Sequence, residues 1–202
     1  MSTKIKLCGM FRDCDIDYVN EAMPDYVGFI VMFPKSHRNI DFETALRLKK
    51  RLSPNIKSVA VSVDAPIEKF AEFSRSGVVD MLQLHGNESA EYIAKLRQLT
   101  DVPLIKAVKV TGFGDVLKAQ ELDVDFLLLD SGTGTGKTFD YSLIDRERIT
   151  KPFFLAGGLT PETVREAAAT LKPYGVDMSS GIETDKSKDR EKILAAVREV
   201  RK

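Results

Sequence analysis

Short apolar runs rich in β-branched residues recur along the chain, and each is followed by a stretch whose apolar positions have helical spacing. Continuous apolar runs such as SVAVSV and DFLLLD are typical of strands buried on both faces, as in parallel sheets. The pattern predicts eight strands, over Ile5–Cys8, Tyr26–Ile30, Ser58–Val63, Met81–Leu84, Leu104–Val108, Phe126–Asp130, Phe153–Ala156 and Val176–Ser179. It predicts helices over Asp41–Leu52, Pro66–Ser76, Ser89–Leu99, Val116–Leu122, Pro161–Leu171 and Lys188–Arg201, with a first helix entered near Cys14.

Two helix starts are marked by capping residues. Thr160 before Pro161 predicts an N-terminus with proline at the first helical position, and Ser89 predicts another before Tyr92–Leu96. Eight strand–helix units in 202 residues fit an α/β fold of the closed (β/α)8 barrel type better than a doubly wound open sheet. No Pro/Gly/Ser-rich linker divides the chain, so we expect one domain over residues 1–202. In such barrels the chemistry lies at the carboxyl ends of the strands.

Composition mainly indicates which classes of function are not expected. The 30 Lys and Arg residues balance 30 Asp and Glu residues, which gives no electrostatic basis for general nucleic-acid binding. No apolar run approaches the roughly twenty residues that span a bilayer, and the N-terminus has no signal-peptide pattern, so we expect no membrane association. The two cysteines, Cys8 and Cys14, form no CxxC motif. They predict neither a disulfide framework nor a zinc site, and the expected location is a reducing cytoplasm.

Two loops of small residues follow the last two predicted strands. LAGGLT places Gly157 and Gly158 after one strand, and DMSSGIE places Ser180 and Gly181 after the next. Small residues let backbone N–H groups approach an anion, and barrels often bind a phosphate group between these two loops. A single such glycine more often only permits a sharp turn, but the two loops together favour a phosphate site.

Two side chains at other strand ends could carry acid–base chemistry. Cys8 could serve as a base or nucleophile near neutral pH, although most free cysteines are small buried hydrophobic residues. Asp130 directly follows an apolar run, where low dielectric favours the protonated form that a general acid needs. Its alternative role is a cap or an ion pair with Lys106 or Lys137, and position alone does not decide between them.

Three further polar residues stand in similar places. Asp177 lies at the end of the last strand, and Arg38 could hold a carboxylate through two parallel hydrogen bonds. His85 in QLHG could be a neutral hydrogen-bond donor or an ordinary loop histidine.

The segment SGTGTGKTF at Ser131–Phe139 nearly matches the phosphate loop of nucleotide hydrolases, G-x-x-x-x-G-K-[ST]. The first glycine of that motif falls on Ser131, and the residues after Thr138 do not read as the helix that the motif requires. We therefore interpret the segment as a mobile glycine-rich loop over the barrel mouth.

Several motifs taken in order closely resemble phosphoribosylanthranilate isomerase, a (β/α)8 enzyme of tryptophan biosynthesis. They are KLCGM at Lys6–Met10, GFI at Gly28–Ile30, SHR at Ser36–Arg38, QLHG at Gln83–Gly86, LLLDSGTGTGKTFDY, LAGGLTPETV and GVDMSSGIE. The resemblance covers essentially the whole chain. It implies conversion of N-(5′-phosphoribosyl)anthranilate to 1-(2-carboxyphenylamino)-1-deoxyribulose 5-phosphate, an Amadori rearrangement that uses no metal or organic cofactor.

The resemblance also implies roles for the candidate residues. Asp130 matches the general acid that protonates the furanose ring oxygen, and Cys8 matches the general base that removes the C2′ proton. Arg38 would hold the anthranilate carboxylate, while His85 and Asp177 would bind sugar hydroxyls or orient the catalytic pair. The phosphate would be held by backbone N–H groups around Gly157, Gly158, Ser180 and Gly181.

The chain departs from the family pattern at a few loop positions. His37 replaces the proline of S-P-R, Thr133–Gly134 replaces a double glycine, and Tyr141 replaces a tryptophan. Met10 replaces a branched aliphatic residue. We expect these changes to affect loop rigidity and turnover rate, since none alters the acid or the base.

Three other functions remain as alternatives. The sister isomerase of the histidine pathway resembles a twofold-repeated barrel with two phosphate sites, whereas here no repeat is found. A non-catalytic phosphosugar-binding barrel would have no use for both Cys8 and Asp130, and a redox protein would need a better placed second thiol than Cys14. The expected partner is therefore a small phosphosugar, and the chain could be a monomer or a homodimer.

Overall fold

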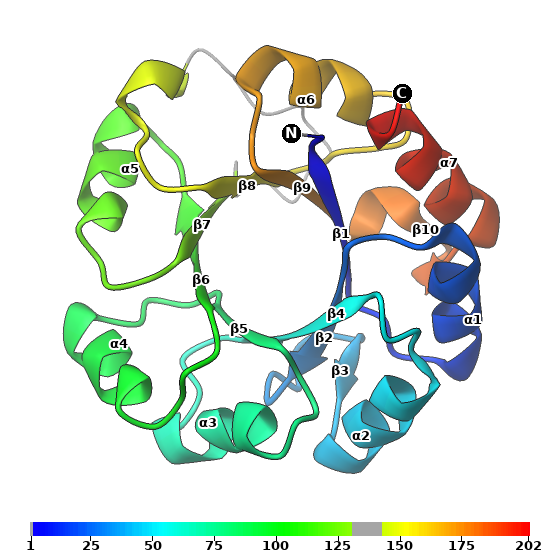
Figure 1. Ribbon diagram of the computed structural model, residues 1–202, viewed down its shortest axis with the longest axis horizontal. Helices are drawn as coiled ribbons and strands as arrows, with labels where there is room; N and C mark the ends of the chain where they lie inside the picture. The colour runs from blue at the N-terminus through cyan, green and yellow to red at the C-terminus, as the bar shows by residue number, and fades with distance from the viewer. Residues whose placement is uncertain (1, 131–142) are drawn as a thin grey trace.

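The computed structural model describes residues 2–130 and 143–202 and has a closed barrel of eight parallel strands as its centre. Strand β1 pairs with both β2 and β9, and this pairing closes the ring seen in Figure 1. The two-residue strand β3 (Asn39–Ile40) adds to the side of β2. The barrel strands are β1 (Lys4–Cys8), β2 (Tyr26–Val31), β4 (Lys57–Ser62), β5 (Met81–Leu84), β6 (Leu104–Lys109), β7 (Phe126–Asp130), β8 (Phe153–Leu155) and β9 (Gly175–Met178). The predicted (β/α)8 barrel is confirmed.

Helices form an outer ring around the strands (Figure 1). They are α1 (Asp13–Ala22), α2 (Phe42–Arg51), α3 (Ile67–Arg75), α4 (Ala90–Arg97), α5 (Phe113–Gln120), α6 (Val164–Leu171) and α7 (Arg190–Val200). The described part of the connection from β7 to β8 contains the 3-10 turn η2 (Arg146–Arg148). The predicted glycine-rich loop at Ser131–Phe139, which includes Lys137, lies outside the described residues, and so does Tyr141. Within those residues, none of the helices has the length and apolar character that crossing a membrane requires.

The capping predictions had different outcomes. Ser89 is confirmed as an N-cap, because its hydroxyl accepts a hydrogen bond from the Tyr92 N–H at the start of α4. The predicted start at Thr160–Pro161 is wrong, since α6 begins only at Val164. The Oγ1 atom of Thr163 instead accepts from the Thr160 N–H at 3.0 Å and closes a turn ahead of the helix. This turn extends the loop after β8, where the sequence predicts an anion site.

The predicted start of the last helix at Lys188 is also wrong. Lys188 belongs to a short antiparallel hairpin formed by β10 (Glu183–Thr184) and β11 (Ser187–Lys188). Helix α7 begins after it, where the Asp189 carboxylate accepts from the Lys192 N–H. The hairpin brings the charged side chains of Glu183 and Lys188 back towards the barrel mouth.

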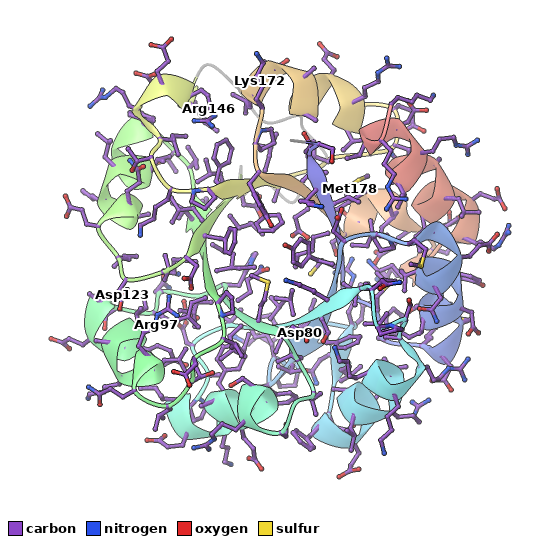
Figure 2. All side chains as sticks on the ribbon, in the orientation of Figure 1. Asp80, Arg97, Asp123, Arg146, Lys172 and Met178 are labelled. Atoms are coloured by element: carbon purple, nitrogen blue, oxygen red, sulfur yellow. The ribbon has the colours of Figure 1, made fainter. Side chains whose placement is uncertain are left out.

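The barrel interior is apolar at one end and polar at the other. Tyr26, Phe126, Phe154 and Tyr174 pack ring against ring near the amino ends of the strands, and the Tyr26 and Tyr174 hydroxyls hydrogen-bond at 2.7 Å. A separate, larger apolar layer fills the space between strands and helices. Charged side chains project outwards from the helices (Figure 2). The aromatic cluster closes the amino end of the barrel, so the polar end is the open one.

Candidate active site

The predicted acid and base lie at the same end of the barrel and face its interior. Cys8 is the last residue of β1 and packs into the interior apolar cluster. Asp130 is the last residue of β7, and Leu128, two positions before it, belongs to the same cluster. Because alternate residues of a strand share a face, Asp130 also points to the interior. Burial raises the pKa of the Cys8 thiol.

A buried ion pair lies in the barrel beneath Cys8. The Lys6 ammonium contacts the Asp177 carboxylate at 2.9 Å, and the Lys6 side chain has no solvent exposure. Burial lowers the pKa of Lys6, but Asp177 and Cys8 outweigh that effect, so the pKa is raised and Lys6 remains an ammonium. Asp177, a predicted site residue, is thus buried and bound to Lys6. Lys6 was not among the residues predicted for the site.

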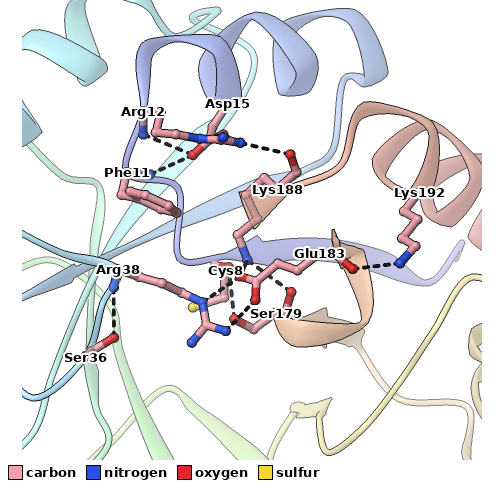
Figure 3. A network of polar contacts seen from close by, with 10 residues as sticks. All are labelled: Cys8, Phe11, Arg12, Asp15, Ser36, Arg38, Ser179, Glu183, Lys188 and Lys192. Carbon is pink, nitrogen blue, oxygen red and sulfur yellow. Dashed lines mark hydrogen bonds and ion pairs between the residues drawn. The ribbon is translucent and has the colours of Figure 1, made fainter. Parts of the chain in front are cut away.

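A second charge network lies over the same strand end (Figure 3). Arg38 donates from Nε and Nη2 to the two carboxylate oxygens of Glu183, each at 2.6 Å, and Lys188 contacts Glu183 at 2.7 Å. Burial raises the pKa of Glu183, but Arg38 and Lys188 outweigh it and hold the pKa at about 2. Lys188 also donates to the Ser179 carbonyl, and the Ser179 hydroxyl donates to the Cys8 carbonyl at 3.1 Å. The network therefore joins Arg38 to the backbone of the predicted base.

The loop that carries Arg38 is held by short-range contacts. The Arg38 N–H donates to the Ser36 hydroxyl at 3.2 Å. His37, which stands where the family pattern has proline, packs edge-to-face on Phe11 with ring centroids 6.1 Å apart. The histidine thus makes a specific contact with the loop that follows β1.

The two loops predicted to bind phosphate are in direct contact. A Cβ on Gly181 would lie 1.9 Å from the Leu159 carbonyl oxygen, so the two backbones touch only because residue 181 is glycine. Gly157 and Gly158 have φ values of 101° and 67°, which favour glycine. Ser180 and Gly181 open the 3-10 turn η3 (Ser180–Ile182). The backbones of the two loops therefore touch at the open end of the barrel beside β1.

His85 follows β5 and lies at the barrel mouth on the side of Asp130. The Gln83 side-chain amide contacts the Nδ1 atom of His85 at 2.9 Å and orients the ring. Burial lowers the pKa of His85, so the imidazole is neutral near pH 7. His85 and Asp130 line a cavity of about 820 Å³ that extends over β6 towards α5.

Lys106, which the sequence analysis considered as an ion-pair partner for Asp130, is bound elsewhere. Its ammonium contacts Glu88 at 2.9 Å and the Gly86 carbonyl at 2.6 Å. The other considered partner, Lys137, is outside the described residues. Within the described chain, no group of three or more His, Cys, Asp or Glu side chains is arranged to hold a metal ion.

Comparison with known proteins decides the family. Residues 4–199 match the family model for N-(5′-phosphoribosyl)anthranilate isomerase. The chain belongs to this family. It is 43% identical over 206 residues to the N-(5′-phosphoribosyl)anthranilate isomerase of Clostridium acetobutylicum, with 98% of each chain covered. The resemblance inferred from the sequence motifs is confirmed, and the protein is an isomerase.

Two solved structures of phosphoribosylanthranilate isomerases show the same fold. One, a complex with reduced 1-(o-carboxyphenylamino)-1-deoxyribulose 5-phosphate, has a TM-score of 0.85 and 34% identity, and 98% of each chain is covered. The other, a monomeric form generated from the dimeric enzyme of Thermotoga maritima, has a TM-score of 0.85, 35% identity and the same coverage.

Proposed function

We propose that this chain converts N-(5′-phosphoribosyl)anthranilate to 1-(2-carboxyphenylamino)-1-deoxyribulose 5-phosphate in tryptophan biosynthesis, with Asp130 as general acid and Cys8 as general base. The observation that carries the assignment is their common placement at the open end of the barrel, on opposite sides of its interior. A substrate lying across the mouth would meet one group from each side.

The proposed reaction needs one proton donor and one proton acceptor. Asp130 donates a proton to the furanose ring oxygen, the bond from that oxygen to C1′ breaks, and a Schiff base forms with the anthranilate nitrogen. The iminium acidifies the neighbouring C2′ proton, which the Cys8 thiolate removes. The electron pair of that C–H bond forms the C1′–C2′ double bond of an enolamine, which tautomerises to the ketone.

Arg38 is the proposed anchor for the anthranilate carboxylate. Glu183 accepts two of the five N–H donors of its guanidinium, from Nε and Nη2. The donors on Nη1 and the second one on Nη2 form another edge that suits a carboxylate. Glu183 therefore fixes the plane of the guanidinium without using the edge that the substrate needs.

The phosphate is proposed to bind the backbone N–H groups around Gly157, Gly158, Ser180 and Gly181. This proposal is supported by the direct contact between the two loops. We also propose that neutral His85 donates a hydrogen bond to a sugar oxygen, which is supported by its position beside Asp130 in the cavity lining. Asp177 is 9% exposed and is bound to Lys6, which favours an orienting role over direct contact with the sugar.

The same proposal extends to the location, domain organisation and oligomeric state of the enzyme. We place the enzyme in the cytoplasm as a single barrel domain over residues 1–202, acting on a phosphosugar without a cofactor. Cys8 and Cys14 are both free, which suits a reducing compartment. The relative from Thermotoga maritima is a dimeric enzyme from which monomers have been generated, and we propose that this chain acts as a monomer or a homodimer.

Substrate turnover tests the reaction. The fluorescent substrate is generated from anthranilate and phosphoribosyl pyrophosphate by the preceding enzyme, and its disappearance is followed with and without a metal chelator. We expect a saturable rate that the chelator does not change. Saturable binding of the substrate without turnover, by protein that is folded, would instead identify a phosphosugar-binding barrel.

A further inference from the structure

Lys6 and Cys8 occupy alternate positions on β1, so both side chains point into the barrel. Both also approach the same point on the neighbouring strand, because Cys8 is in register with Gly28 of β2. A Cβ on Gly28 would lie 2.7 Å from the Cys8 sulfur and 3.2 Å from the Lys6 nitrogen. The thiol and the ammonium are therefore neighbours, and glycine at position 28 provides the space in which they meet.

The Lys6 ammonium has hydrogen-bonding capacity for both neighbours. One of its three N–H donors binds Asp177, which leaves two donors for the sulfur of Cys8, its neighbour at Gly28. Lys6 is in register with Asp177 across the β1–β9 pairing, so the backbone itself fixes the ion pair. The nitrogen consequently cannot move away from Cys8 without breaking a buried salt bridge, which is costly.

We propose that Lys6 is a positioning residue for the isomerisation, whose ammonium, held by Asp177, stabilises the thiolate of Cys8 and directs its lone pair. This inference rests on the proposed function, because it assigns the base role to Cys8. A base must be deprotonated before it can remove a proton, and burial of Cys8 opposes its deprotonation. A fixed cation beside the sulfur offsets part of that penalty.

The other charges that face Cys8 explain why Lys6 has this role. Asp177 on β9 disfavours the thiolate, whereas Lys188 on β11 and Arg38 in the loop after β2 favour it. Both of those cations, however, are bound to the Glu183 carboxylate, which offsets their charge. Lys6, by contrast, is paired with Asp177, and its ammonium and the Cys8 sulfur both approach Gly28.

Titration of Cys8 tests this inference without substrate. In a Cys14→Ser background Cys8 is the sole cysteine, and the 13Cβ chemical shift of labelled cysteine follows its ionisation directly. We expect Lys6→Met to raise the midpoint by about one pH unit or more, as loss of an adjacent opposite charge does. Asp177→Asn should lower the midpoint, because it removes the anion that opposes the thiolate. Opposite shifts from the two partners of one ion pair are not a consequence of structural loosening.

Lys4→Met is the matched control. Lys4 lies on the same strand and also forms an ion pair, with Asp25, but at the far end of the barrel. Its loss should leave the midpoint unchanged. A Lys6→Met midpoint equal to that of the control, or shifts of the same sign in Lys6→Met and Asp177→Asn, would overturn the proposal.

A double variant keeps the test decisive if Lys6→Met alone does not fold. Lys6→Met with Asp177→Asn leaves no uncompensated buried charge, and its midpoint should lie above that of the parent. A midpoint at or below that of the parent would contradict the proposal. Turnover by Cys8→Ala tests the base role of Cys8 separately from its coupling to Lys6. Undiminished turnover would remove the base assignment and leave the measured coupling of Lys6 to Cys8 intact.

Discussion

Glu183 accepts hydrogen bonds from Nε and Nη2 of Arg38 through both of its carboxylate oxygens, each at 2.6 Å. The two residues are 145 positions apart in the chain, and neither side chain is more than 19% exposed. The pair fixes the plane and reach of the guanidinium before substrate arrives. The geometry of Arg38, the proposed carboxylate anchor, thus depends on a second residue.

Glu183→Gln should weaken substrate binding more than it slows the chemistry. Loss of a charged partner allows the Arg38 guanidinium to leave its plane, so we expect KM to rise about tenfold, the effect of one charge-assisted hydrogen bond. The kcat should change much less, because Glu183 contacts neither proposed proton-transfer group. Steady-state kinetics measures both constants, and Glu191→Gln, at an exposed residue in the first turn of α7, is the control and should change neither. A fall in KM would show instead that Glu183 competes with the substrate for Arg38.

Glu183 should also make the free energy of unfolding depend on pH below about pH 4.5. The pKa of Glu183 is held at about 2 against an ordinary value of 4.5, so its contribution to stability is complete above about pH 4.5 and is lost as the pH falls towards 2. It amounts to at most about 3 kcal/mol, from 1.36 kcal/mol per pKa unit. Urea unfolding at several pH values should show a gap between wild type and Glu183→Gln that narrows below pH 4.5. A gap that is constant with pH would be inconsistent with this effect.

Gly28→Ala should damage catalysis through the base. The added methyl group would lie 2.7 Å from the Cys8 sulfur and 3.2 Å from the Lys6 nitrogen, so at least one of them must move. We expect kcat to fall by at least about tenfold, because a displacement near 1 Å is costly in a positioned site. Gly114→Ala on α5 is the control, since a methyl group there meets nothing within 4 Å. Unchanged kcat in Gly28→Ala would mean that the sulfur position is not critical.

Gly181→Ala should separate the two loops that are proposed to bind phosphate. Its Cβ would lie 1.9 Å from the backbone oxygen of Leu159, which has no flexible end that could yield. We expect affinity for ribose 5-phosphate to fall sharply and stability to drop by roughly 2 kcal/mol or more. Gly114→Ala should instead be neutral or stabilising by about 0.5 kcal/mol. Calorimetric titration and thermal unfolding check both, and retained affinity in Gly181→Ala would count against this phosphate site.

Much of the fold is predictable because its strands are buried on both faces and read as continuous apolar runs. Each barrel strand begins and ends within one residue of its predicted bounds. The errors lie where local residues do not decide the structure. Thr160 has the features of a cap, yet Thr163 takes the hydrogen bond, and the two-residue strands β10 and β11 are too short to produce a periodic pattern.

The sequence also predicted some residues of the candidate site and missed others. Cys8 and Asp130 are predictable because they stand where apolar strands end, a position with a general meaning in barrels. Lys6 and Glu183 were missed because their partners, Asp177 and Arg38, are far away in the chain. For Lys6 a signal was present: a lysine inside a buried strand, on the same face as Cys8, requires a partner. For Glu183 the partner follows only from the fold of the hairpin.

The most direct test compares turnover by wild type, Cys8→Ala, Asp130→Asn and Cys14→Ala, each with binding of the reduced product analogue measured by calorimetry. We expect both Cys8→Ala and Asp130→Asn to bind the analogue with little change and to lose at least about a hundredfold in kcat, as removal of a general acid or base does. Cys14→Ala should retain full activity. Undiminished turnover in either Cys8→Ala or Asp130→Asn would contradict the acid–base pair on which the proposed reaction depends.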